Sequence, residues 1–273
     1  MENIDYTQAL PDGLSTMITA GGILLLSAII VMTIVIAKRW KGRFIPMLLG
    51  IVAYIIFGFI CTNLITSVIA LIPGTDAVFT NSPNTYKIVY YITATIAFTV
   101  ARIVCSYMYV ERYERQGDIY LGGIGLGLGD CALYGITSII NLTWVTAISS
   151  TGLESVFADF APDQVASTYE SISNLFTAPT FLWLLLAISC IYDIVLNIAL
   201  MNVVYGAVKG QIAKYWIGVS AAFHFVTVIS FQFYDETAPS SVALWFCVKT
   251  VIFVAVVYYV FNNVSKEISY KND

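Results

Sequence analysis

Seven apolar runs occupy most of the 273-residue chain, and they constrain its fold more than any other feature. Each is long enough to cross the roughly 30 Å hydrocarbon core of a bilayer as an α-helix. The runs cover residues 15–37, 44–72, 86–110, 119–148, 179–206, 215–234 and 241–264. A composition that is 59% hydrophobic and 11% charged is typical of polytopic membrane proteins. We therefore expect an all-α helical bundle of about seven transmembrane helices, forming a single integral membrane domain over residues 1–273.

The loops between the runs separate into basic and acidic ones. Basic residues follow the first, third, fifth and seventh runs: Lys38, Arg39, Lys41, Arg43, Arg112, Arg115, Lys209, Lys214, Lys266 and Lys271. The opposite loops carry mostly acids: Asp76, Glu154, Asp159, Asp163, Glu170, Asp235 and Glu236. Because cytoplasmic loops are enriched in Lys and Arg, the N-terminus is expected outside and the C-terminus in the cytoplasm. An odd number of spans fits this distribution.

Charge and cysteine usage narrow the class of partner. A net charge of −4 argues against nucleic acid, so the expected partner is the lipid bilayer of the cell membrane. The oligomeric state is not indicated by the sequence. Five cysteines fall inside the predicted spans without a CxxC pair, and are expected to be buried core residues: Cys61, Cys105, Cys131, Cys190 and Cys247. A short interfacial helix is expected over residues 163–174, after Pro162.

Polar groups at bilayer depth are costly, so each is a candidate functional residue. The candidates are Arg102 in the third run, Asp130 in the fourth, Asp193 and Asn197 in the fifth, His224 in the sixth and Lys249 in the seventh. At about 1.5 Å per residue, all but Lys249 fall in one layer slightly cytoplasmic of the midplane. This layer predicts a polar chamber lined by the third to sixth runs.

Helical spacing places further polar residues on the same faces. The third run offers Thr95, Thr99, Arg102, Ser106 and Tyr109, the fourth Asp130, Tyr134, Thr137 and Asn141, and the sixth Ser220, His224 and Thr227. Structural roles are open beside catalytic ones. Arg102 suits an ion pair with Asp130 or Asp193, and Asn197 suits an interhelical hydrogen bond. Lys249 suits a pairing partner or a snorkelling side chain.

The stretch GGIGLGLGDCALYG, residues 122–135, places a glycine ladder directly before Asp130. A phosphate-binding loop is excluded because no lysine follows and no strand precedes it. Gly123 with Gly127, and Gly125 with Gly129, form two overlapping GxxxG pairs, which favour close approach of another helix or a substrate. Helix packing explains the glycines but not the carboxylate.

Two short motifs resemble those of the presenilin and signal-peptide-peptidase class of intramembrane aspartyl proteases. Gly127-Leu128-Gly129-Asp130 spells GxGD, and Tyr192-Asp193 spells YD. In that class the YD helix precedes the GxGD helix, whereas here the order is reversed.

A broader resemblance, to the bacterial YhfC-type family of intramembrane peptidases, covers most of the chain. That family typically reads EExxR on one helix and GxGHGGxE on the next. Gly123, Gly125 and Gly127 match the second motif, Asp130 stands where the family has glutamate, and His224 matches a late histidine.

The same comparison reveals departures at the residues that would carry chemistry. Leu126 stands at the histidine position, and Phe98 and Thr99 precede Arg102 where two glutamates are expected. The resemblance therefore implies a multi-pass protein of the intramembrane-peptidase type whose catalysis is attenuated or lost.

Three functions follow as expectations. In an active peptidase, Asp130 would activate water, and Asp193 or His224 would share its proton. Arg102 would stabilise an oxyanion. The substrate would be a membrane-embedded peptide or protein. A divalent metal ion held by His224 and the two aspartates is an open alternative. The other functions are a non-catalytic peptide-binding, lipid-binding or regulatory protein, and a small proton-coupled transporter.

Overall fold

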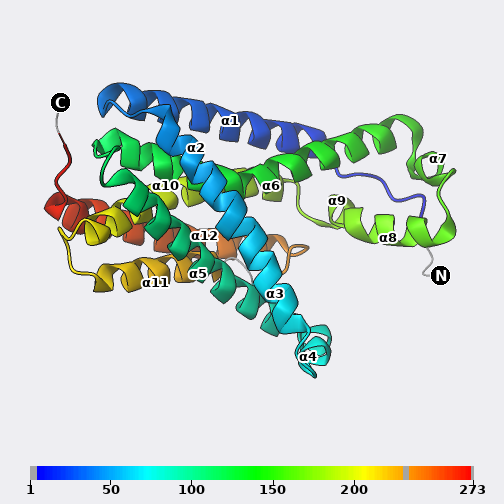
Figure 1. Ribbon diagram of the computed structural model, residues 1–273. Coiled ribbons are helices and arrows are strands. Elements are labelled where there is room, and N and C mark those ends of the chain that lie inside the picture. Colours follow the sequence, from blue (N-terminus) through cyan, green and yellow to red (C-terminus); the bar gives the residue numbers. More distant parts are fainter. Residues whose placement is uncertain (1–4, 230–233, 272–273) are drawn as a thin grey trace.

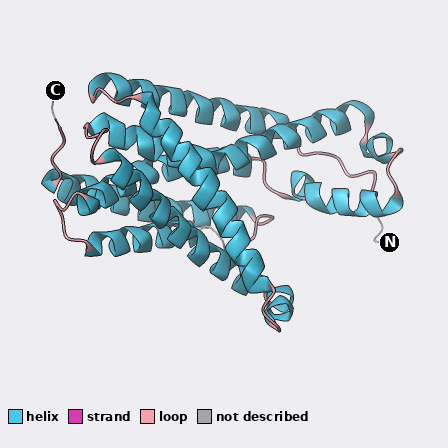
Figure 2. Cartoon of the chain, in the orientation of Figure 1, coloured by secondary structure: helices cyan, strands magenta, loops and turns pink. Residues whose placement is uncertain are grey.

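The computed structural model describes residues 5–229 and 234–271. Within these ranges the protein is a bundle of helices that contains no strand (Figure 2). The helices are α1 (Leu14–Arg39), α2 (Phe44–Ala53), η1 (Tyr54–Cys61), α3 (Thr62–Ala70), α4 (Thr75–Asn81), α5 (Pro83–Tyr109), α6 (Gln116–Thr151), α7 (Leu153–Phe157), α8 (Pro162–Ile172), α9 (Asn174–Thr177), α10 (Phe181–Val208), α11 (Tyr215–Ile229), α12 (Pro239–Tyr259), η2 (Val260–Val264) and η3 (Ser265–Glu267).

Six helical segments of the described chain are long and apolar enough to cross a membrane. They are α1, the continuous segment Phe44–Ala70, α5, α6, α10 and the segment Pro239–Glu267. The predicted sixth run is the exception, because α11 is a shorter apolar helix of Tyr215–Ile229 and residues 230–233 lie outside the described ranges. The polytopic helical bundle is confirmed. Helix α1 begins and α12 ends at opposite ends of it (Figure 1), while the single-domain organisation stays a prediction.

Helix α6 is the central element, packing against α1, α2 and α10. Its glycines make this possible, since a Cβ added to Gly123 or Gly127 would meet the backbone of α10 at Ile198 or Ile194. One added to Gly125 would strike the carbonyl oxygen of Met47 in α2. The predicted close packing on two neighbouring faces is therefore confirmed.

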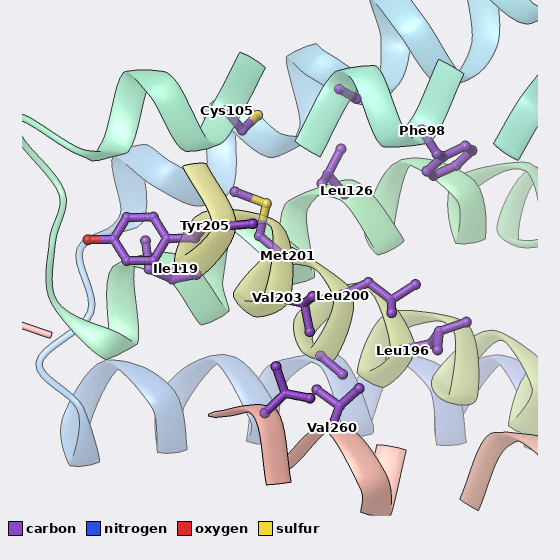
Figure 3. Close-up of a cluster of buried hydrophobic side chains, with 14 of the residues drawn as sticks. Phe98, Cys105, Ile119, Leu126, Leu196, Leu200, Met201, Val203, Tyr205 and Val260 are labelled. Carbon is purple, nitrogen blue, oxygen red and sulfur yellow. The ribbon is translucent and has the colours of Figure 1, made fainter. Parts of the chain in front are cut away.

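A core of buried apolar side chains lies between α5, α6, α10 and η2 (Figure 3). Leu126 of α6 lies within it and is fully buried. A second cluster joins α1 and the far end of α6 to α8, whose Val165 and Ile172 are buried, so the short helix predicted over 163–174 forms and packs on the bundle. All five cysteines are free thiols, but only Cys105 and Cys131 are buried as expected, and the expectation is wrong for Cys247, which is exposed.

Candidate functional site

A cavity of about 270 Å³ lies between α5, α6, α10, α11 and α12, and both predicted aspartates line it. Asp130 comes from α6 and Asp193 from α10, and each is half-buried. Ser189 and Lys249 add two further polar groups, while Leu186 and Val228 are among the apolar residues of the wall. The glycines before Asp130 place its backbone close to α10, which brings the two carboxylates to one cavity.

Lys249 of α12 is held inside this cavity by α10. Its Nζ lies 3.0 Å from Oδ2 of Asp193 and 2.5 Å from Oγ of Ser189. Ser189 and Asp193 are four residues apart and therefore share one face of α10. The lysine is 2% exposed, so the ammonium group is compensated by these partners and not by bulk water. The expectation that Lys249 is a pairing partner is confirmed.

Arg102 is joined to the cavity through α10 and not through a carboxylate. Its Nη2 donates a 2.7 Å hydrogen bond to Oδ1 of Asn197, whose Nδ2 donates to the carbonyl oxygen of Asp193 at 2.9 Å. The guanidinium is fully buried, and its Nε and Nη1 have no partner among the described residues. Arg102 and Asn197 thus form an interhelical hydrogen bond between α5 and α10, as expected for Asn197. The alternative of a direct ion pair between Arg102 and either aspartate is wrong within the described chain.

His224 of α11 is buried beside the same arginine. Its ring packs on Phe98 with centroids 4.9 Å apart, and the Arg102 Cζ lies 5.7 Å from the centre of that ring. Nδ1 of His224 has no hydrogen-bond partner in the described part of the chain. Phe98 thus contacts both the histidine ring and the guanidinium group.

The predicted polar faces differ in how far they are buried. The five residues of the third run are all buried, as are the three of the sixth. On α6, however, Thr137 is exposed and Ser138 is buried in its place. Sequence reasoning did not single out Ser189, although its position four residues before Asp193 marks it as a residue of the same helix face. The catalytic roles of Asp130, Asp193, His224 and Arg102 stay predictions.

A family model described as YhfC intramembrane metalloprotease matches residues 22–262. The match runs from α1 to η2 and includes every residue of the cavity. No curated protein and no solved structure matches the chain.

A catalytic metal ion, which that description implies, does not fit the residues of this chain. Such an ion needs about three His, Asp, Glu or Cys ligands around one point. No such group of three occurs within residues 5–229 and 234–271. Arg102 contacts the Phe98 ring on which His224 packs, so a divalent cation at the histidine would be repelled by the guanidinium group.

Phe98, Thr99 and Leu126, which depart from the motifs expected of the family, each have packing or hydrogen-bond partners of their own. Phe98 packs its ring on His224, and Thr99 donates its hydroxyl to Thr95 of its own helix at 2.8 Å. Leu126 lies in the buried apolar core. These three side chains are therefore integrated into the packing of the bundle.

Proposed function

Because the chain belongs to the YhfC intramembrane metalloprotease family, we propose that it is a member that works without a catalytic metal ion and binds a membrane-embedded peptide in its polar chamber, within the cell membrane. One observation carries the proposal: an ammonium group, that of Lys249, is fixed inside the cavity by Asp193 and Ser189. The cavity is thereby provided with its own cation, paired to one of its two carboxylates.

Asp130 supplies the group that recognises the ligand. It lines the cavity and accepts no hydrogen bond from any residue that the structure describes. It also interacts electrostatically with Asp193, Lys249 and Arg102, so its charge belongs to a cluster of two acids and two bases. A carboxylate in a low-dielectric site needs hydrogen-bond donors. A peptide inside a bilayer has backbone N–H groups that need acceptors wherever it is not helical, which makes it a complementary ligand.

Two measurements on the purified, full-length protein test this proposal. Elemental analysis is expected to find no stoichiometric transition metal. A photo-crosslinking amino acid at Val228, which lines the cavity, is expected to capture peptide, and Asp130→Asn is expected to reduce the capture. The matched control is the same label at Val226, which is 46% exposed on the same helix. Stoichiometric metal that His224→Ala removes, or equal capture at both positions, would overturn the proposal.

A second function, peptide hydrolysis by a carboxylate pair, is favoured by the presence of Asp130 and Asp193 in one cavity. In such a pair one carboxylate activates water and the other donates a hydrogen bond to the scissile carbonyl. The Lys249 ion pair on Asp193 opposes this role, because it occupies one of the two required groups. Cleavage of a co-expressed membrane reporter that both Asp130→Asn and Asp193→Asn abolish would favour hydrolysis over binding alone.

A further inference from the structure

Two cysteines lie side by side at the contact between α6 and α10. Cys131 belongs to α6 and Cys190 to α10, and both are free thiols. Sγ of Cys131 donates a hydrogen bond to the carbonyl oxygen of Cys190, at a distance of 3.3 Å. The thiol of one helix therefore lies against the backbone of the residue that carries the other thiol. Such proximity is the first requirement of a disulfide.

The register of the two helices places these cysteines opposite each other. A Cβ added to Gly123 of α6 would lie 2.5 Å from Cα of Ile198 in α10. A Cβ added to Gly127 would lie 2.7 Å from Cα of Ile194. Four residues forward along α6 are thus matched by four residues backward along α10, so the helices are antiparallel and each step is about one helical turn. One further step of the same length leads to the two cysteines.

The register is also fixed on the other side of the cysteines. The hydroxyl group of Tyr134 on α6 donates a 2.9 Å hydrogen bond to the carbonyl oxygen of Trp183 on α10. The cysteines therefore lie between a close glycine contact and an interhelical hydrogen bond, which together limit how far the helices slide or separate. A disulfide needs Cα atoms about 4.4–6.8 Å apart, a separation that glycines make possible between neighbouring helices.

Both thiols border the polar cavity of about 270 Å³, which Cys131 and Cys190 line together with the two aspartates. The open space beside them lets each side chain rotate toward the other. Cys190 is partly exposed, whereas Cys131 is buried. A small reagent that enters the cavity therefore meets Cys190 first, and the reactivity of a thiol depends on such access.

We propose that Cys131 and Cys190 are a reversible redox pair that forms a disulfide between α6 and α10 in the wall of the polar cavity. The oxidant is a small, membrane-soluble disulfide. The thiolate of Cys190 attacks one of its sulfur atoms, which forms a mixed disulfide and releases one thiol. The thiolate of Cys131 then attacks the sulfur of Cys190, which closes the internal disulfide and releases a second thiol. The two released thiols carry away the two cysteine protons and the two electrons that the protein loses.

The disulfide joins the two helices where both carboxylates reach the cavity. Cys131 directly follows Asp130, and Cys190 precedes Asp193 by three residues, so the second pair shares one face of α10. Oxidation therefore holds the two aspartate-bearing helices at one separation, and reduction releases them. Transient disulfides of this kind are typical of redox sensing in reducing compartments. The pair does not depend on the proposed function, because its chemistry needs only the two thiols.

Peptide mass mapping of the full-length protein in lipid nanodiscs tests the proposal, with a small excess of 4,4′-dithiodipyridine as the oxidising disulfide. Wild-type protein is expected to yield a peptide pair that joins Cys131 to Cys190 and weighs two hydrogen atoms less than the separate peptides. Dithiothreitol is expected to remove this cross-link. Cys247, which is exposed on α12, is expected to retain its mixed disulfide with the reagent.

Three variants give the test its controls. Cys131→Ser is expected to lose the cross-link and to leave the mixed disulfide on Cys190, and Cys190→Ser is expected to lose it with Cys131 largely unreacted. The matched control, Cys131→Ser/Gly135→Cys, moves the thiol one turn along α6 to a position where an added Cβ meets nothing within 4 Å. It is expected to form no cross-link with Cys190. No cross-link in the wild type, or an equal yield in this control, would overturn the proposal.

Discussion

The Nζ of Lys249 lies 3.0 Å from Oδ2 of Asp193, inside the membrane-spanning part of the bundle and across the contact between α12 and α10. The lysine is almost fully buried and the aspartate only slightly exposed. Each charge is therefore the principal compensation of the other. Separating such partners leaves an ion in a medium where it is poorly solvated, which costs more than the intact pair contributes.

Removal of one partner is accordingly expected to be worse than removal of both. Lys249→Met should lower the free energy of unfolding by about 3 kcal/mol, because it leaves the Asp193 carboxylate without its cation. The double variant Lys249→Met/Asp193→Leu should recover much of that loss. Thermal unfolding of the detergent-solubilised variants measures the effect. Additive losses in the double variant would show that the pair is not coupled.

The glycine ladder of α6 provides a second prediction. Gly125→Ala places a methyl group against the backbone of Met47, and overpacking of this kind costs about 1–3 kcal/mol. Gly135→Ala on the same helix is the control, because nothing lies within 4 Å of its added Cβ. The control should be neutral or slightly stabilising, since alanine favours the helix by up to about 1 kcal/mol. Thermal unfolding distinguishes the two, and equal losses would contradict a packing role for the ladder.

The ladder also shows what can be predicted from this sequence. GxxxG spacing depends only on helical geometry, so the two packing faces of α6 could be predicted from residue positions. The membrane spans could also be predicted, because a span must be an apolar run long enough to cross the bilayer. Thr137 and Ser138 show the limit. Helix α6 has 36 residues and meets different partners at its two ends, so the buried face at Asp130 does not extend unchanged to residue 137.

The sequence predicted which residues belong to the candidate site, but not which of them contact one another. Depth along each helix places Asp130, Asp193 and Arg102 near one another, yet it does not determine the rotation of each helix. Arg102 therefore binds Asn197, and Asp193 binds Lys249, although the predicted polar layer excluded that lysine.

A second ion pair, between the buried Asp118 and the partly exposed Arg43, supports a third prediction. Asp118 is fully buried and accepts hydrogen bonds from the backbone N (2.8 Å), Nε and Nη2 (2.5 Å) of Arg43. The hydrogen bond to Asp118 raises the pKa of the Arg43 guanidinium. Because this pKa lies above the unfolded value, the stabilisation from Arg43 is fully present below that value and is lost only at strongly alkaline pH.

Asp118→Asn should therefore destabilise the protein at every ordinary pH. The expected loss in the free energy of unfolding is about 1.5–3 kcal/mol, because the donors of Arg43 lose a charged acceptor. Glu111→Gln, which neutralises an exposed acid of the connection between α5 and α6, should have little effect. Urea or thermal unfolding in detergent provides the comparison. A loss for Glu111→Gln as large as that for Asp118→Asn would indicate a general charge effect.

Leu126, which stands where the sequence comparison expects a histidine, provides the last prediction. Leu126→His places an imidazole among the buried apolar side chains between α5, α6 and α10. Burial of an unsatisfied polar group costs about 1–3 kcal/mol, and loss of the leucine packing adds to this. We expect a less stable protein that gains no affinity for Zn²⁺, because Phe98 and Thr99 still provide no ligands.

Leu126→Met is the control for this substitution, because it retains an apolar side chain of similar volume and should cost less than about 1.5 kcal/mol. Thermal unfolding measures the stability of both variants, and elemental analysis after exposure to Zn²⁺ measures the metal content. A stable Leu126→His protein that retains one zinc ion per chain would show that the site accepts a metal after a single substitution. The expected result is destabilisation without bound metal. It would show that a metal site in this chain requires changes on more than one helix.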